Sequence, residues 1–190
     1  LLVGRAQHEA HPGPLIERVH LVALGLALPP GGERLHPFGV LGGEVDNAFC
    51  CVRPPGHHAE RDRAMGFCFY NNIACAAVQA LDIYGLDRIA ILDFDVHHGN
   101  GTEDIFRDDP RVMFCSSFQH PFYPDTPIDH GHPRIVSVPL PAGTRGMDFR
   151  EAIGAAWFPA LERFAPQMLL ISAGFDAHHE DPMADLMLNE

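Results

Sequence analysis

Three short apolar runs in this chain are each followed directly by a cluster of histidine and carboxylate side chains. The runs cover residues 48–52, 89–92 and 168–171, and each has the length of a buried strand. In open α/β sheets, ligands bind just beyond the carboxyl ends of the parallel strands. Clusters that recur at this position can converge on one pocket, so the pattern predicts a parallel sheet with a site along one edge.

The cluster after residues 89–92 has the sequence D-F-D-V-H-H-G-N-G-T and carries the clearest metal-ligand spacing. Because successive side chains of a strand point to opposite faces, Asp93, Asp95 and His97 can project in the same direction. A carboxylate and an imidazole at this spacing suit a divalent cation such as zinc, which binds nitrogen and oxygen at about 2.0–2.2 Å. A single Asp-x-His is more often an N-capping Asp beside solvated histidines, so the interpretation depends on the other two clusters.

Those two clusters have the same character. Residues 53–60, R-P-P-G-H-H-A-E, form a turn in which prolines and a glycine present His57 and His58 side by side. Residues 172–182, S-A-G-F-D-A-H-H-E-D-P, follow the last apolar run. Taken alone, the histidine pair could be an ordinary surface turn. Three such clusters at strand ends together indicate a shared metal site.

The rest of the chain is expected to form one globular α/β domain over residues 1–190, because 46% of its residues are hydrophobic and strands alternate with helices. This alternation predicts a mostly parallel sheet with helices on both faces. Pro159 should kink or split the last helix. Strands are expected at residues 48–52, 88–93, 111–116, 134–138 and 168–171, and helices at residues 14–28, 71–84, 101–106 and 148–164.

The formal charge of −12 argues against a broad nucleic-acid-binding face, which would need clustered Lys and Arg. An acidic surface would attract a lysine-bearing peptide or a polyamine, although plain solubility explains the charge equally well. We find no apolar run of membrane-spanning length and no N-terminal signal, so we expect no membrane association and a cytoplasmic location. The five cysteines lack zinc-type Cys-x-x-Cys spacing and are expected to be reduced core residues.

With the clusters in this order, the chain resembles the zinc-dependent histone deacetylase superfamily. That superfamily includes bacterial deacetylase-like amidohydrolases, acetylpolyamine amidohydrolases and acetoin-utilisation proteins. Besides the three clusters, the resemblance rests on G-F-C-F-Y-N-N (66–72) and F-Y-P-D-T (122–126). Glu60 and Asn100 are more similar to the class II branch. The resemblance implies a three-layer arginase/deacetylase-like fold and removal of acetyl or other acyl groups from lysine side chains or related amines.

The resemblance also implies which residues hold the metal. Asp95, His97 and Asp176 would bind one Zn²⁺ and leave room for a water and the substrate carbonyl. A potassium ion is implied nearby. Its ligands would come from side chains and backbone oxygens of Asp93, Asp95, His97, Ser116 and Ser117.

Two paired imidazoles are implied beside the metal. His57 would be hydrogen-bonded to Asp93 and His58 to Asn100, and His58 would be the general base. Because two carboxylates already neutralise Zn²⁺, its bound water is acidified less than with three neutral imidazoles, and a positioned base is needed.

The implied substrate channel is lined by Gly66, Phe67, Tyr123 and Met183. A narrow aromatic slot suits a lysine stem that ends in a neutral amide, because it buries methylenes and excludes a hydrated ammonium. The expected partner is an acetylated lysine peptide or protein, or an acetylated polyamine. Met183 favours the peptide, because polyamine-directed members of the family carry an acid at that position.

One element of the family pattern has no match. The family places a Tyr or His that polarises the carbonyl in a glycine-rich loop after Asp176, and no such loop follows within this chain. We therefore expect a domain that is incomplete at its C-terminus and hydrolyses slowly, since one electrophilic group contributes about 10²–10³ in rate. A two-manganese arginase-like site is disfavoured, because it would need acids at Gly99 and His178. A non-catalytic module that binds acetylated ligands remains an alternative.

Overall fold

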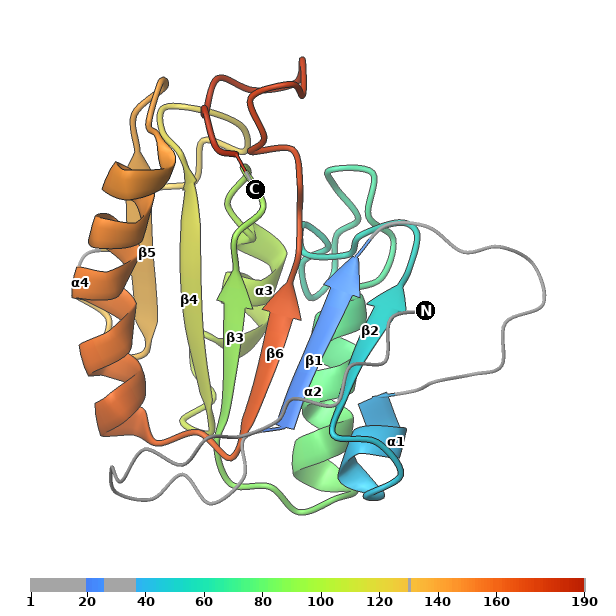
Figure 1. The fold of residues 1–190 in the computed structure, drawn as a ribbon. Coiled ribbons are helices and arrows are strands. Elements are labelled where there is room, and N and C mark those ends of the chain that lie inside the picture. The colour runs from blue at the N-terminus through green and yellow to red at the C-terminus, as the bar shows by residue number, and fades with distance from the viewer. Residues whose placement is uncertain (1–19, 26–36, 130, 190) are drawn as a thin grey trace.

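All six strands of the sheet run parallel to their neighbours, in the order β2-β1-β6-β3-β4-β5 (Figure 1). This computed structural model describes residues 20–25, 37–129 and 131–189. The expected parallel α/β sheet is confirmed. The strands are β1 (His20–Gly25), β2 (Asn47–Cys51), β3 (Ile89–Asp93), β4 (Val112–Gln119), β5 (Ile135–Leu140) and β6 (Met168–Ser172).

Helices cover both faces of the sheet and make a three-layer arrangement (Figure 1). Alternate residues of β3 belong to different cores, as the period of a strand requires. Ile89 and Ile91 pack with residues of three helices on one face, whereas Ala90 and Leu92 pack on the other face beneath the fourth helix. The helices are α1 (Pro37–Leu41), α2 (Asn72–Asp82), α3 (Asn100–Phe106) and α4 (Gly146–Phe164).

The predicted helix at residues 14–28 is wrong over its central part. His20–Gly25 is strand β1, which pairs with β2 on one side and β6 on the other. A strand inside a parallel sheet is apolar on both faces, so its sequence is a nearly continuous apolar run that also matches a helical period. The flanking residues 14–19 and 26–28 lie outside the described residues.

The other expected elements lie close to their predicted positions. Helix α2 begins after Asn71, whose side chain accepts a hydrogen bond from the Ala74 backbone N–H. Strand β4 continues three residues beyond the predicted end at 116, so the following loop is shorter than expected. Helix α4 is not split at Pro159. Burial of Trp157 and Ala160 against the sheet keeps the helix continuous on both sides of the proline.

The cysteines were expected to be core residues, but only two of the five are buried. Cys68 and Cys115 are buried, Cys50 and Cys51 are half-buried, and Cys75 is exposed on α2. The expectation fails for Cys75 because the outer face of an amphipathic helix can carry a small apolar residue without cost. None of the described helices combines the length and hydropathy needed to cross a bilayer.

Asn71→Ala should lower the free energy of unfolding by about 2–4 kcal/mol. Besides capping α2, the buried Asn71 amide donates to the Ala59 carbonyl and to Thr102 Oγ1, so its loss leaves buried groups unpaired. Arg145 is a matched control, because it occupies the N-cap position of α4 without a side-chain cap bond. Arg145→Ala should change stability by less than about 0.5 kcal/mol in the same urea titration. Equal effects of the two substitutions would contradict this account.

Candidate metal centre

The pairing of β3 with β6 brings two of the polar clusters together. Asp93 and Ser172 are register partners at the ends of these strands, so the chain leaves the sheet there in two adjacent segments. The backbone N–H of Phe94 donates to the Ser172 carbonyl at 3.2 Å, and that of Val96 donates to Asp176 Oδ1 at 3.0 Å. These bonds fix the two segments side by side above the sheet.

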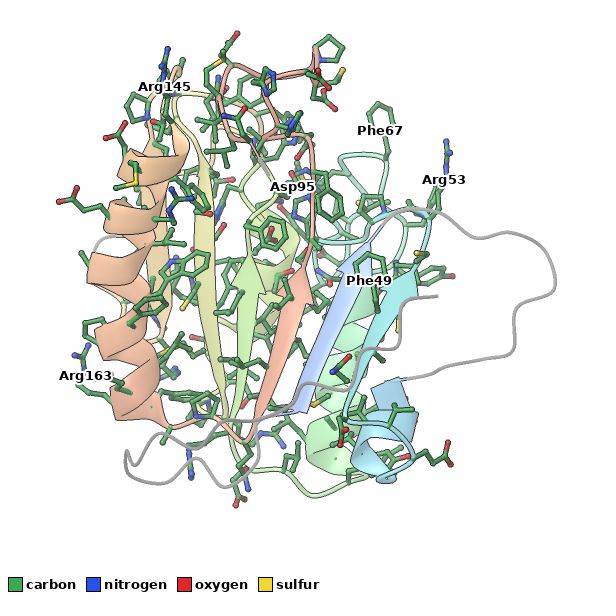
Figure 2. All side chains as sticks on the ribbon, viewed as in Figure 1. Phe49, Arg53, Phe67, Asp95, Arg145 and Arg163 are labelled. Carbon is green, nitrogen blue, oxygen red and sulfur yellow. The ribbon has the colours of Figure 1, made fainter. Side chains whose placement is uncertain are left out.

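Three side chains on these segments converge on one point. Asp95, His97 and Asp176 have ligand atoms that all lie within 4.8 Å of one another, and no other group of this kind occurs among the described residues. His97 Nδ1 lies 3.0 Å from Asp95 Oδ1 and 3.1 Å from Asp176 Oδ2. Figure 2 shows Asp95 just beyond the carboxyl ends of the strands. A Cβ atom at Gly174 would overlap the Asp95 carboxylate, so glycine is required for this approach.

The charges of this cluster favour a cation. Burial lowers the pKa of His97, but hydrogen bonds to Asp176 and Asp95 outweigh it and raise the pKa to about 9. Burial raises the pKa of Asp95, but His57 and His97 outweigh it and hold the pKa well below its usual range. The two carboxylates therefore hold a proton on His97 at neutral pH. A divalent cation can take the place of that proton, and two carboxylate oxygens with one imidazole nitrogen are donors that zinc uses.

The tandem histidines lie beside this cluster and are held by different partners. His57 Nδ1 donates to Asp93 Oδ2 at 2.9 Å, whereas His58 Nδ1 lies 2.8 Å from the amide oxygen of Asn100. The two rings are 4.0 Å apart. All four side chains are buried. The partners are those that the resemblance implied, and the catalytic roles stay predictions.

Because their partners differ, one imidazole is a cation and the other is neutral. Burial lowers the pKa of His57, but the Asp93 and Asp95 carboxylates outweigh it and raise the pKa to about 10, so His57 is a cation at neutral pH. Burial and the neighbouring His57 charge lower the pKa of His58, which is therefore neutral. Only a neutral imidazole has a lone pair that can accept a proton, so this arrangement suits His58 as a base.

A pocket of about 1180 Å³ opens above the tandem histidines and the metal-ligand cluster. Its lining contains all four residues predicted for the channel, together with two prolines, two further phenylalanines and three histidines. The lining residues are Arg53, Pro54, Pro55, His57, His58, Gly66, Phe67, Phe69, Asp95, His97, Phe122, Tyr123, Asp176 and Met183.

The aromatic residues stand at different depths of this pocket. Phe67 is 92% exposed, so it is a rim residue and not part of the core, and Figure 2 shows it pointing outward beside Arg53. Tyr123 lies deeper, with its ring 5.1 Å from that of His58. Gly66 has a left-handed φ of 56°, and a Cβ atom there would overlap the His58 ring. The glycine therefore lets the backbone at residue 66 approach the His58 ring.

Sequence reasoning missed Phe122, which stacks on His97 with ring centroids 5.1 Å apart. It also missed the buried His98, whose Nε2 lies 2.9 Å from Glu103 Oε2. The first could have been suspected from its place beside Tyr123. The contact of His98 with Glu103 could have been predicted only if residue 100 were known to begin a helix, because the spacing of five residues alone does not indicate it.

The predicted potassium ligands all lie in or just after β3 and β4: Asp93, Asp95, His97, Ser116 and Ser117. Asp93 and Ser116 are register partners, and the Ser116 hydroxyl is hydrogen-bonded to His98 Nδ1. The buried Ser117 hydroxyl has no hydrogen-bond partner among the described residues. A buried hydroxyl oxygen without a partner is a group that a bound ion would satisfy. Potassium binding stays a prediction.

An α/β sheet with a carboxylate–imidazole cluster and tandem histidines at its strand ends is the arrangement that the resemblance to the histone deacetylase superfamily implied. The histone deacetylase domain matches residues 34–190. The chain is 44% identical to a histone deacetylase-like amidohydrolase from Pseudomonas aeruginosa, over 98% of this chain and 49% of that protein. It is also 43% identical to the polyamine deacetylase HDAC10 of Rattus norvegicus, over 75% of this chain and 26% of that protein. This chain belongs to the histone deacetylase family.

A solved structure supports the same assignment. The crystal structure of the HDA15 HD domain superposes with a TM-score of 0.74 and 38% sequence identity, covering 80% of this chain and 46% of that one. The chain spans about half the length, or less, of the curated relatives it matches.

The cluster should bind one divalent ion per chain. Asp95→Asn combined with Asp176→Asn should abolish binding, because only one strong ligand remains. His178→Ala together with His179→Ala is a matched control from the same loop, and it should leave the bound metal unchanged. Metal analysis of the purified, dialysed protein measures the number of ions bound per chain. Two ions per chain, or metal retained by the double Asn variant, would contradict a mononuclear site.

Metal affinity should rise with pH up to about 9. In the metal-free protein the pKa of His97 is raised to about 9, so below that pH the ion must displace a proton. Each unit of pH between 9 and 7 should therefore weaken zinc binding by about tenfold. Competition with a zinc chelator, corrected for its own protonation, measures this slope. An affinity that does not change across this range would show that His97 is not a ligand.

Proposed function

We propose that this chain carries the catalytic centre of a zinc-dependent deacylase that hydrolyses the side-chain amide of acylated lysine. The main support is one observation. The Asp95–His97–Asp176 cluster and the neutral His58 both line the same aromatic pocket, so an ion, a base and a bound amide would meet in one place. Membership of the histone deacetylase family supports the same reaction.

The pocket suits an acylated lysine and not the free amine. Its proline and aromatic side chains, among them Phe67, Phe122 and Tyr123, can cover the methylenes of a lysine stem. An acyl amide has no charge, whereas a free ammonium would have to lose its hydration to enter. The product amine would accordingly leave the pocket more readily than the substrate.

Each polar residue has a distinct task in the proposed reaction. A bound Zn²⁺ would polarise the amide carbonyl and make water more acidic. His58 Nε2 accepts a proton from the attacking water, while its Nδ1–H is held by Asn100. The same imidazolium then returns the proton to the departing lysine nitrogen. His57, kept cationic by Asp93, stabilises the negative charge that develops during attack.

The rim of the pocket favours peptides over polyamines as substrates. Asp95 and Asp176 are the only carboxylates among the lining residues that the structure describes, and both belong to the metal cluster. The rim itself carries the apolar Met183 and the cationic Arg53. A polyamine would bring a second ammonium group to this rim without a carboxylate to receive it. Because one relative is named a polyamine deacetylase, acetylated polyamines remain the second candidate.

Turnover of an acetyl-lysine peptide and of acetylspermidine, compared at the same concentration, tests this choice. We expect the peptide to have the higher kcat/KM, and a higher value for acetylspermidine would reverse the assignment. A protein that binds a hydroxamate in the pocket but hydrolyses neither substrate would instead be a module that binds acylated ligands without catalysis.

His58→Ala should reduce kcat for the acetyl-lysine peptide by about 10²–10⁴-fold, because no other neutral base stands beside the cluster among the described residues that line the pocket. Metal content should not change, since His58 is not one of the converging ligands. His179→Ala is the control, because His179 also belongs to a histidine pair but lies outside the pocket. A His58→Ala protein with near-normal turnover would show that the base is another group, and one that loses its metal would make His58 a ligand.

A further inference from the structure

Both the oxygen and the nitrogen of the Asn100 side-chain amide have polar partners. Its oxygen lies 2.8 Å from His58 Nδ1, and its nitrogen donates to Glu60 Oε1 at 2.8 Å and contacts Met65 Sδ at 3.1 Å. Glu60 in turn accepts hydrogen bonds from Arg63, whose guanidinium donates to both carboxylate oxygens at 3.0 and 2.9 Å. A continuous chain of hydrogen bonds therefore runs from the surface to the base.

The end of the amide that faces His58 decides where that imidazole carries its proton. A carboxylate can only accept hydrogen bonds, so Glu60 can bond only to the NH₂ end of Asn100. This contact turns the amide oxygen toward His58, and the oxygen in turn requires a proton on His58 Nδ1. The lone pair of the neutral imidazole is then left on Nε2.

Glu60 is an anion in this position. The hydrogen bonds from Arg63 lower the pKa of its carboxyl group, although burial acts in the opposite direction. Asn100 itself is 4% exposed, so its amide lies in surroundings of low polarity, where a neighbouring charge polarises a hydrogen bond strongly. The negative charge of Glu60 thus strengthens the Asn100 oxygen as an acceptor.

We propose that Glu60 is a positioning residue for His58: it sets the orientation of the Asn100 amide and thereby the tautomer of the base. This inference rests on the proposed function, in which His58 accepts a proton at Nε2. Arg63 assists by keeping Glu60 ionised and in place. Glu60 is not among the described residues that line the pocket, and it acts through Asn100.

A double-mutant cycle tests the contact. Glu60→Leu should lower kcat by about 10- to 100-fold with little change in KM, because the amide loses the partner that orients it. Asn100→Asp should have a similar effect, since it places two carboxylates against each other. Adding Glu60→Gln to Asn100→Asp should recover at least about tenfold of the lost kcat, because the Gln amide can donate to the carboxylate introduced at residue 100. Asp62→Leu, at an exposed acid of the same loop, should leave kcat unchanged.

If Glu60 only stabilises its own loop, the losses of kcat caused by Glu60→Gln and by Asn100→Asp would add in the double variant. No recovery of kcat would then occur, and this result would overturn the proposal. The tautomer gives a second readout that does not depend on turnover. In the ¹⁵N spectrum of the zinc-loaded protein, His58 should carry its proton on Nδ1, and Glu60→Leu should introduce the Nε2–H form. An unchanged spectrum would also overturn it. A wild-type protein without deacylase activity would refute the proposed function, while the spectrum would still decide the role of Glu60.

Discussion

The site depends above all on the parallel pairing of β6 with β3 in the middle of the sheet. These strands are far apart in the chain, yet their register places Asp93 opposite Ser172. The segments that follow are joined by backbone hydrogen bonds to the Ser172 carbonyl and the Asp176 carboxylate. A shift of one residue in this register would turn every side chain of the shifted strand to the opposite face and separate the candidate ligands. The sheet core that fixes this register therefore also fixes the geometry of the metal centre.

Balance of charge is the second constraint. Asp93, Asp95 and Asp176 bring three carboxylates to the end of two strands, and such a group is costly to bury unless positive charge meets it. His57 takes one charge through Asp93, and His97 is protonated between the other two. A divalent cation would satisfy the last two carboxylates and release the His97 proton. His58, held by an amide, is kept out of this balance and stays neutral.

The sequence allowed the sheet and most elements to be predicted, because each depends on local pattern, whereas the grouping of Asp95, His97 and Asp176 was implied only by the family resemblance. Helix α2 lies close to its predicted range, since the Asn71 cap at its start acts within three residues. The helix expected over His20–Gly25 was wrong, because the sequence of a strand inside a parallel sheet has no period of two to reveal it. The contact of Glu60 with Asn100 joins residues 40 positions apart, and no local signal indicates it. Likewise, only the coordinates distinguish the exposed Phe67 from a core residue.

The most direct test of this account is the coordination shell of the bound ion. X-ray absorption at the zinc edge of the loaded protein should show only light-atom ligands at about 2.0–2.2 Å, including one imidazole, with no second metal nearby. Asp95→Asn should alter that shell, whereas His58→Ala should leave it intact. Sulfur at about 2.3 Å, two or more imidazoles, or a metal neighbour at about 3.5–4 Å would contradict a site built from Asp95, His97 and Asp176.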